Sequence, residues 1–190
     1  MSQIEITELS TEHLILRQWR DNDLPPFAKL NADLGVMEYY PNTLNLEESN
    51  EMARKLKSLL ANRGWGFWAV EEKKSNQFIG FVGLHQPTYD LPVTGCTEIG
   101  WRLAKSYWGL GYATEAAKMA LNYAFTTLNE KEIFSFTPTG NHRSRSVMER
   151  IGMQNTKNNF EHPIIPKGHK LRDHVLYKIN KEQWVEQCSI

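Results

Sequence analysis

The sequence predicts a mixed α/β fold in one domain, and three observations support this prediction. The chain has 190 residues, and because domains run about 100–200 residues, two domains would both be undersized. The hydrophobic fraction of 41%, with 8 Phe, 7 Tyr and 6 Trp, suffices for a packed core and excludes a wholly disordered chain. Strand-like and helix-like patterns alternate along the chain without a repeat, a low-complexity tract or a linker. We therefore expect one core formed by residues 1–190.

The first expected elements are a strand over residues 11–19 and a helix that follows it. The strand shows the period-2 alternation of a half-buried segment. Asp21 or Asp23 can cap the following helix. Pro25-Pro26 fit its first turn, because the amide hydrogens that proline lacks have no partner there.

The next expected elements are a second helix and a hairpin. Asn45 is placed as the N-cap, with Glu48 three residues later in the position of a capping box. Gly64 ends the helix, since glycine adopts the left-handed conformation that helix ends use. Residues 65–70 and 78–84 then form two strands joined by a polar turn.

The second half of the chain continues the alternation. We expect a strand over 97–103, a long helix from about 113 to 128, a strand over 133–137, a short helix over 144–151, and strands near 153–160 and 173–179, followed by a terminal segment around 183–186. Gly152 stops the short helix.

Charge and cysteine content restrict the classes of function. Lys plus Arg and Asp plus Glu both number 22, so there is no global basic field to attract nucleic acid or anionic lipid. The start of the chain is acidic where a signal peptide is basic, and charges interrupt every hydrophobic stretch before it could span a bilayer. Cys96 and Cys188 lie far apart without a CxxC spacing, which argues against a zinc knuckle, a redox pair or a disulfide scaffold. We expect a cytoplasmic protein that binds neither nucleic acid nor membranes.

The turn from Trp108 to Thr114 is a candidate anion site. Gly109 and Gly111 allow close approach of the backbone, and the helix that follows offers unpaired amide hydrogens and the positive end of its dipole. The alternative is that the glycines only permit a tight turn. A dinucleotide fold is disfavoured because Thr114 stands where the GxGxxG pattern needs its third glycine, and a P-loop is absent from the sequence.

Two longer stretches carry a family resemblance. Residues 98–103 and 107–116 (EIGWRL and YWGLGYATEA) resemble the acetyl-CoA motif of the GCN5-related N-acetyltransferases, the GNAT superfamily. Residues 141–144 and 147–153 (NHRS and VMERIGM) resemble the second signature of the branch that acetylates ribosomal-protein N-termini. The resemblance implies a GNAT-type α/β fold: a mostly antiparallel mixed sheet of about seven strands, with helices on both faces and a splayed pair of central strands.

The resemblance also implies acetyl-CoA as cosubstrate and assigns residues to it. The implied cofactor-binding residues are Trp101, Arg102, Leu103, Trp108, Gly109, Leu110, Gly111, Tyr112, Ala113, Thr114, Asn141, Arg143 and Ser144. Trp108 departs from the family pattern, which has Arg or Gln there. Main-chain amides can hold a diphosphate without that side chain, so this departure bears on affinity rather than on the identity of the site.

Glu98 is the candidate general base, acting through water. An α-amino group with a pKa near 8 needs about 1.4 kcal/mol to lose its proton at pH 7, whereas a lysine needs roughly 4.6 kcal/mol. A modest base therefore suffices for an N-terminal amine. The alternative is that Glu98 is a surface or ion-paired carboxylate of the strand.

Ser144 is the candidate general acid. Many relatives place a tyrosine seven residues after the position of Asn141, but this chain has Met148 there, which cannot donate a proton. Either Ser144 donates to the leaving thiolate, or the thiolate leaves unaided. Ser144 could equally be the N-cap of its helix. Asn141 is expected to bind the cofactor arm through its amide.

The histidines do not predict a metal site. His162, His169 and His174 are irregularly spaced, HExxH is absent from the sequence, and neither cysteine is near them. By the resemblance, the segment from Phe160 to His174 shapes the wall on the acceptor side. The segment Tyr39-Tyr40-Pro41 forms the opposite wall or, alternatively, anchors a loop.

These features predict an acetyl-CoA-dependent N-acetyltransferase that transfers the acetyl group directly to a primary amine. A protein or peptide N-terminal amine is the favoured acceptor, and a small amine such as a polyamine or a drug is the alternative. Two hypotheses from different functional classes are a non-catalytic acyl-CoA sensor and, more weakly, a nucleic-acid module based on Arg143, Arg145 and Arg150. We expect no metal and a monomer or homodimer.

Overall fold

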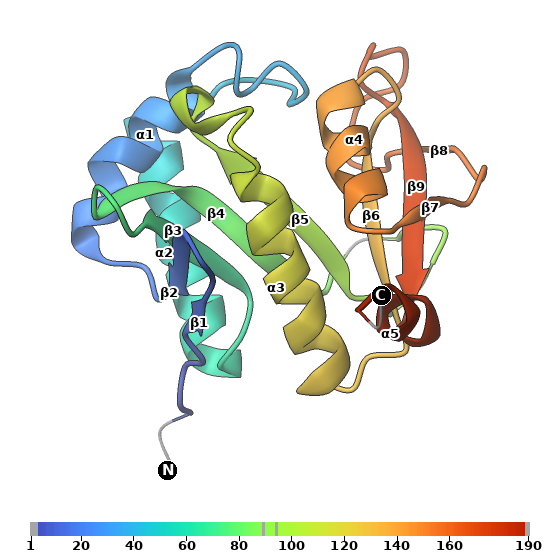
Figure 1. Ribbon diagram of the computed structural model, residues 1–190. Coiled ribbons are helices and arrows are strands. Elements are labelled where there is room, and N and C mark those ends of the chain that lie inside the picture. The colour runs from blue at the N-terminus through green and yellow to red at the C-terminus, as the bar shows by residue number, and fades with distance from the viewer. Residues whose placement is uncertain (1–3, 89, 94, 189–190) are drawn as a thin grey trace. The chain divides into compact units, whose positions relative to one another are not determined.

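The computed structural model describes residues 4–88, 90–93 and 95–188 (Figure 1). The chain forms two compact units: the first holds Met1–Leu84 and Gly100–Ala120, and the second holds His85–Ile99 and Leu121–Ile190. Strand β5 (Glu98–Leu103) and helix α3 (Tyr112–Thr126) contribute residues to both units.

The strands of the first unit form an antiparallel sheet. They are β1 (Leu9–Ser10), β2 (Leu14–Arg17), β3 (Phe67–Glu72) and β4 (Gln77–His85), in the order β1-β2-β3-β4, followed by β5. The expected hairpin is confirmed, since β3 and β4 pair with Trp68 opposite Val82. The first strand is shorter than expected, because only its four central residues pair with β3.

The helices of the first unit begin and end largely where the sequence predicts. They are the 3-10 turn η1 (Asp21–Asp23), α1 (Leu24–Ala32) and α2 (Leu46–Arg63). The capping box of α2 is confirmed, because Asn45 Oδ1 accepts from the amide of Glu48 at 3.0 Å, and Gly64 closes the helix with a φ of 78°. Asp23 stands at the N-cap of α1, but its carboxylate binds the Arg17 guanidinium at 2.8 Å instead of capping the helix.

An aromatic cluster forms part of the core of the first unit. Trp19 and Phe27 meet edge to face with ring centroids 4.9 Å apart, and Phe81 lies 6.0 Å from Phe27. Such pairs add about 0.5–1.5 kcal/mol each beyond the burial of their area. Figure 1 shows α2 behind β3. The aromatic cluster and α2 stabilise the strands of the first unit, which precede the glycine turn along the chain.

The sheet of the second unit is built around β6 (Glu132–Pro138) and β9 (Asp173–Asn180), which pair antiparallel along their whole length. The parallel ladder between β5 and β6 holds the single pair Glu98 and Phe134, as expected of strands that splay apart. The prediction of one strand over residues 153–160 is wrong. Two short strands, β7 (Gln154–Asn155) and β8 (Phe160–Glu161), replace it and pair separately with β9.

A turn at Lys157 explains this correction. Lys157 has a φ of 61°, and its amide donates to Asn155 Oδ1 at 2.8 Å. An Asx-type bond of this kind gives the backbone a local partner in place of a neighbouring strand.

The helices of the second unit are α4 (His142–Arg150), α5 (Lys181–Cys188) and the end of α3. The expected terminal segment is helical: the Gln183 amide donates to Asn180 Oδ1 at 2.8 Å, and Gln183 Oε1 accepts from the Asn180 amide at 3.0 Å. Trp184 is buried, with its ring centroid 6.1 Å from that of Phe125.

The described residues thus form a mixed, mostly antiparallel α/β structure with five α-helices, which confirms the fold class. Three of the nine strands described have only two residues. In the part of the chain that the structure describes, there is no helix long and apolar enough to cross a membrane. The single domain over residues 1–190 stays a prediction.

Candidate active site

The glycine turn before α3 has an open surface. Gly109 and Gly111 have φ values of 78° and 83°, which L side chains rarely adopt, and a Cβ added at either position would meet no atom within 4 Å. The amide of Glu115 donates to Gly111 O at 3.0 Å, so α3 starts directly after the second glycine. A ligand can therefore approach the backbone amides at this helix start closely.

Glu115 fixes the start of α3 to the turn between β1 and β2. Its carboxylate accepts from the His13 amide at 2.8 Å and lies 2.9 Å from His13 Nδ1, and it also accepts from the Thr11 hydroxyl. Burial acts to raise the pKa of Glu115, but these hydrogen bonds outweigh it and the pKa is lowered. Glu115 therefore stays ionised and holds the helix start in place. No sequence pattern singled out this residue.

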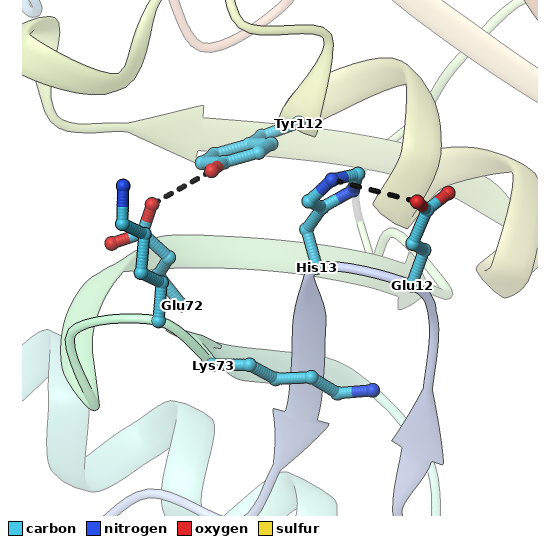
Figure 2. A pocket seen from close by; sticks show the side chains of 6 residues that line it. Glu12, His13, Glu72, Lys73 and Tyr112 are labelled. Atoms are coloured by element: carbon cyan, nitrogen blue, oxygen red, sulfur yellow. Dashed lines mark hydrogen bonds and ion pairs between the residues drawn. The ribbon is translucent and has the colours of Figure 1, made fainter.

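A pocket of about 310 Å³ lies beside Tyr112, the first residue of α3 (Figure 2). The Tyr112 hydroxyl donates to Glu72 Oε1 at 2.7 Å, and the His13 ring lies 5.8 Å from the Tyr112 ring. The lining residues are Glu12, His13, Glu72, Lys73, Lys74 and Tyr112. Their acidic and basic groups balance, so the pocket shows no preference for one sign of charge.

Trp108 joins the glycine turn to the end of β5. Its indole Nε1 donates to Leu103 O at 2.9 Å, and its ring is half-buried. This bond explains how a tryptophan fits where the family pattern has Arg or Gln. Trp101, two residues before Leu103, is also half-buried, whereas Leu103 is buried.

The Arg102 side chain points into the layer of α1 and α2. It is 7% exposed, and Nη1 donates to Asn31 Oδ1 at 2.7 Å. Its guanidinium stacks on the Tyr40 ring, with 4.0 Å between Cζ and the ring centroid. Any contact of Arg102 with the cofactor through this side chain would require these interactions to break, so its backbone is the part available.

Glu98 opens β5 in an apolar part of the second unit. It pairs with Phe134 on β6 and follows Cys96, and Phe134 and Cys96 belong to one buried cluster. Burial raises the pKa of Glu98 to about 8. Glu98 is half-buried, and it forms no ion pair among the described residues, which disfavours the alternative of an ion-paired carboxylate.

Cys96 does not fit the role of a nucleophile. It is a buried free cysteine, and burial, followed by the charge of Glu98, raises the pKa of its thiol. The thiolate is the nucleophilic form, so this environment disfavours attack by Cys96.

Asn141 caps α4 and holds two hydroxyl groups. Its Oδ1 accepts from the Ser144 amide at 3.2 Å, which makes Asn141 the N-cap and excludes that role for Ser144. Its Nδ2 donates to Thr137 Oγ1 at 2.9 Å and to Ser144 Oγ at 3.1 Å. Because both hydroxyl oxygens act as acceptors, both O–H groups keep their protons for other partners. Thr137 was not predicted from the sequence.

The remaining residues of α4 have different surroundings. Met148 is buried in the core, and Arg143 is exposed. Arg145 is anchored to its own unit, because its Nη1 donates to Thr139 O at 3.1 Å and its Nε to the Tyr177 hydroxyl at 3.4 Å.

Two of the three histidines form an aromatic cluster. The rings of His162 and His174 lie 4.7 Å apart and pack with Phe136 and Phe160. Burial, and then the charge of His174, lower the pKa of His162 to about 4. Within the described residues, no three His, Cys, Asp or Glu side chains cluster closely enough to hold a metal ion.

The structure brings the candidate residues together in two sets. The first unit holds Arg102, Leu103, Trp101 and the turn from Trp108 to Thr114. The second unit holds Glu98, Asn141, Arg143 and Ser144.

The comparisons with known proteins all indicate the same family. Residues 13–154 match the family model described as "Acetyltransferase (GNAT) domain". The uncharacterized N-acetyltransferase YnaD of Bacillus subtilis is 28% identical over 177 residues, which cover 93% of this chain and 98% of that protein. A GNAT-family acetyltransferase from Bacillus anthracis has a similar crystal structure, with a TM-score of 0.77 and 27% identity over 93% of this chain and 99% of that chain.

Two other similar proteins have names that specify an acceptor. The putative ribosomal N-acetyltransferase YdaF of Bacillus subtilis is 30% identical over 105 residues, 55% of each protein. The spermidine N-acetyltransferase of Vibrio cholerae, solved with CoA and spermine, has a TM-score of 0.71 and 22% identity over 91% of this chain and 98% of that chain. The second likeness concerns the fold alone.

Proposed function

The chain belongs to the GNAT family of acetyltransferases, and from this membership we propose that it acetylates the N-terminal amine of a protein or peptide with acetyl-CoA. The enzyme is an N-acetyltransferase. The observation that supports acetyl-CoA binding is the open backbone at Gly109 and Gly111, at the start of α3. The N-terminal acceptor is supported by the similarity to the putative ribosomal N-acetyltransferase YdaF. The alternative acceptor is a small amine, as in the name of the spermidine N-acetyltransferase of Vibrio cholerae.

The diphosphate of acetyl-CoA fits the glycine turn. The space beside both glycines and the first amides of α3 suit an anion, and the residues that would hold it run from Trp108 to Thr114. Trp101, Arg102 and Leu103 would contribute the backbone of β5, and Asn141, Arg143 and Ser144 would contribute from the second unit. When bound, acetyl-CoA supplies a thioester with an activated acetyl group.

Glu98 is proposed as the general base. With a pKa of about 8, about one Glu98 in ten is ionised at pH 7, and this fraction rises tenfold at most as the pH increases. This pKa is close to that of an α-amino group, so proton transfer from the acceptor, directly or through water, is nearly balanced in free energy. A lysine acceptor has a pKa near 10.4 and would be harder to deprotonate.

Ser144 is proposed as the proton donor to the departing sulfur. Asn141 donates an amide hydrogen to Ser144 Oγ, which leaves the Ser144 proton available for donation. Water then returns a proton to the serine oxygen, and Glu98 releases to solvent the proton that it took from the amine. The nitrogen of the acceptor gains the acetyl group directly, without an acyl-enzyme, and this agrees with the buried, protonated Cys96.

We also propose that residues 1–190 work as one domain. The family match from residue 13 to residue 154 includes parts of both units, and β5 and α3 each belong to both. Neither unit is expected to function alone, because a boundary between the two units would divide both the strand β5 and the helix α3.

Thiol release tests the proposed function. The purified protein is incubated with acetyl-CoA and either a peptide with a free N-terminus, the same peptide with its N-terminus blocked, or spermidine. Release of free thiol with the free peptide alone is expected. Release with spermidine alone would contradict the peptide acceptor, and no release with any amine would contradict the transferase reaction.

A further inference from the structure

The first turn of α3 begins without a side-chain cap. Gly111 precedes Tyr112, the first residue of the helix, and glycine has no side chain that could cap the turn. The first amides of an α-helix have no carbonyl partner within the helix, so those of Tyr112, Ala113 and Thr114 are the ones that a bound anion can reach. The preceding turn contains glycines with positive φ, which restrict the backbone little. The orientation of these amides therefore depends on the contacts that side chains of the helix make.

Tyr112 makes the first of these contacts. Its hydroxyl donates to Glu72 Oε1 at 2.7 Å, at the end of β3, as Figure 2 shows. The Ser75 hydroxyl donates to the other carboxylate oxygen of Glu72 at 2.5 Å. These two hydrogen bonds lower the pKa of Glu72, and the bond to Glu72 raises the pKa of Tyr112. At neutral pH the tyrosine therefore keeps its proton and the carboxylate keeps its charge, as this bond requires.

Glu115 makes the second contact, three residues further along α3. Its carboxylate accepts from the Thr11 hydroxyl at 2.5 Å and from the His13 amide at 2.8 Å, both in the turn between β1 and β2. Residues three apart in a helix lie on the same face, so Tyr112 and Glu115 extend from one face of the first turn. The free amides point along the helix axis instead, so these two contacts leave them uncovered.

The groups that these two side chains bind belong to one hydrogen-bonded piece of the sheet, within the first unit. Glu72 pairs with Leu14 in the ladder between β2 and β3. The amide of Lys73 donates to His13 O at 2.9 Å. The end of β3 and the turn between β1 and β2 therefore hold each other in place. A single contact would let the start of α3 pivot, whereas two contacts to one piece of sheet restrict its rotation.

We propose that Tyr112 and Glu115 position the main-chain amides of α3 for the diphosphate of acetyl-CoA, without touching the cofactor through their side chains. The first turn is already oriented before the ligand binds, so binding does not include the entropy loss of ordering it. In this role the Tyr112 hydroxyl acts through Glu72, whereas the family resemblance implied only that residue 112 lies at the cofactor. The inference rests on the proposed function and adds two positioning residues to it.

Calorimetry with CoA and steady-state kinetics with acetyl-CoA test the role of Glu115. Glu115→Ala removes the acceptor and should weaken CoA binding about tenfold, the loss of one hydrogen bond from an amide to a charged group. Glu115→Gln keeps an oxygen that can accept from Thr11 and His13, so its affinity should stay within about twofold of the wild type. The KM for acetyl-CoA should change by the same factors. The value of kcat should stay within about twofold, because neither Glu98 nor Ser144 takes part in these contacts.

A double-mutant cycle tests the role of Tyr112. Tyr112→Phe removes only the hydroxyl, and Glu72→Ala removes its acceptor, so each should weaken CoA binding about threefold. The double variant should lose no more affinity than either single variant, since both changes remove the same contact. If the Tyr112 hydroxyl bound the cofactor directly, Glu72→Ala would keep the wild-type affinity, and this result would overturn the proposed role.

Glu48→Ala is the matched control for Glu115→Ala. Glu48 also lies in the first turn of a helix of the first unit, α2, where its carboxylate accepts from the Asn45 amide at 2.8 Å. The control variant should lose stability in urea unfolding, as Glu115→Ala does, but it should keep the wild-type affinity for CoA.

The outcomes separate the inference from the proposed function. Wild-type affinity in Glu115→Ala, or equal losses of affinity in Glu115→Ala and Glu48→Ala, would overturn the inference. Equal losses in Glu115→Ala and Glu115→Gln would also overturn it, because the charge and not the position would then be responsible. If Glu115→Ala does not fold, the cycle of Tyr112 and Glu72 decides. A wild-type protein that binds no CoA would contradict the proposed function instead.

Discussion

The starts of α3 and α4 are built in opposite ways. The start of α3 follows Gly111, which has no side chain, and the space around it is open. The start of α4 is closed by Asn141, whose amide group caps the helix and binds Thr137 and Ser144. An open helix start offers main-chain amides to an anion, whereas a closed one positions side chains for proton transfer. We therefore expect changes at the glycine turn to alter mainly the affinity for CoA, and changes at Glu98 and Ser144 to alter mainly the chemical step.

The largest effect is expected at Glu98, in the second unit. Glu98→Gln should lower kcat by about 10²–10⁴-fold, the usual contribution of a general base, with little change in the affinity for CoA. Wild-type activity should rise with pH through about 8, because only the carboxylate of Glu98 can accept a proton. In the variant, any remaining rise should come from the acceptor amine, whose own pKa is near 8. Steady-state kinetics from pH 6 to pH 9 measures both.

The stability of Glu98→Gln separates chemistry from folding. The pKa of Glu98 is raised in the folded state, so its contribution to stability is present below its ordinary value and is lost as the pH rises through about 8. The variant should therefore be at least as stable as the wild type at pH 8 in urea unfolding. Glu132→Gln, at an exposed carboxylate, serves as the control. Equal loss of activity in both variants would argue against Glu98 as the base.

The next effect is expected at the glycine turn. Gly111→Val should weaken CoA binding by roughly 10- to 100-fold, because each hydrogen bond to a charged group contributes about 1.5–3 kcal/mol. Gly168→Val is the matched control, since Gly168 also has a positive φ, of 79°, and open space around it. Calorimetry with CoA measures the affinity. Similar losses in both variants would show that backbone strain, and not the site, is responsible.

A smaller effect is expected at Ser144. Ser144→Ala should lower kcat by about tenfold, because a thiolate with a pKa near 8.5 leaves readily with little help from an acid. Ser146→Ala, on the same helix, should have wild-type kinetics. If kcat is unchanged in Ser144→Ala, the sulfur leaves without this donor.

The smallest effect is expected for the cap of α4. Asn141→Ala should lower the free energy of unfolding by about 1 kcal/mol, the usual value of an N-cap. Asn141→Asp keeps an oxygen that can accept from the Ser144 amide, so it should be more stable than the alanine variant. Both variants lose the donor to Ser144 Oγ and should share a reduced kcat. Urea unfolding and kinetics of the pair test this separation.

Prediction from the sequence was most accurate where the signal is local. The capping box of Asn45 and Glu48 and the end of α2 at Gly64 need only a few adjacent residues, and both are confirmed. The prediction of one strand over residues 153–160 failed because the turn at Lys157 interrupts it. The N-cap hypothesis for Ser144 failed because Asn141, three residues earlier, caps the helix.

The fold class, the family motifs and the glycine turn could all be predicted from the amino-acid sequence, because each depends on the order of residues within short segments. The surroundings of single side chains became visible only in the folded chain. Burial raises the pKa of Glu98 to about 8, and Arg102 lies among Asn31, Tyr40 and Met52, which come from other elements. Desolvation and pairing depend on groups that are distant in sequence, so a one-dimensional pattern does not contain them.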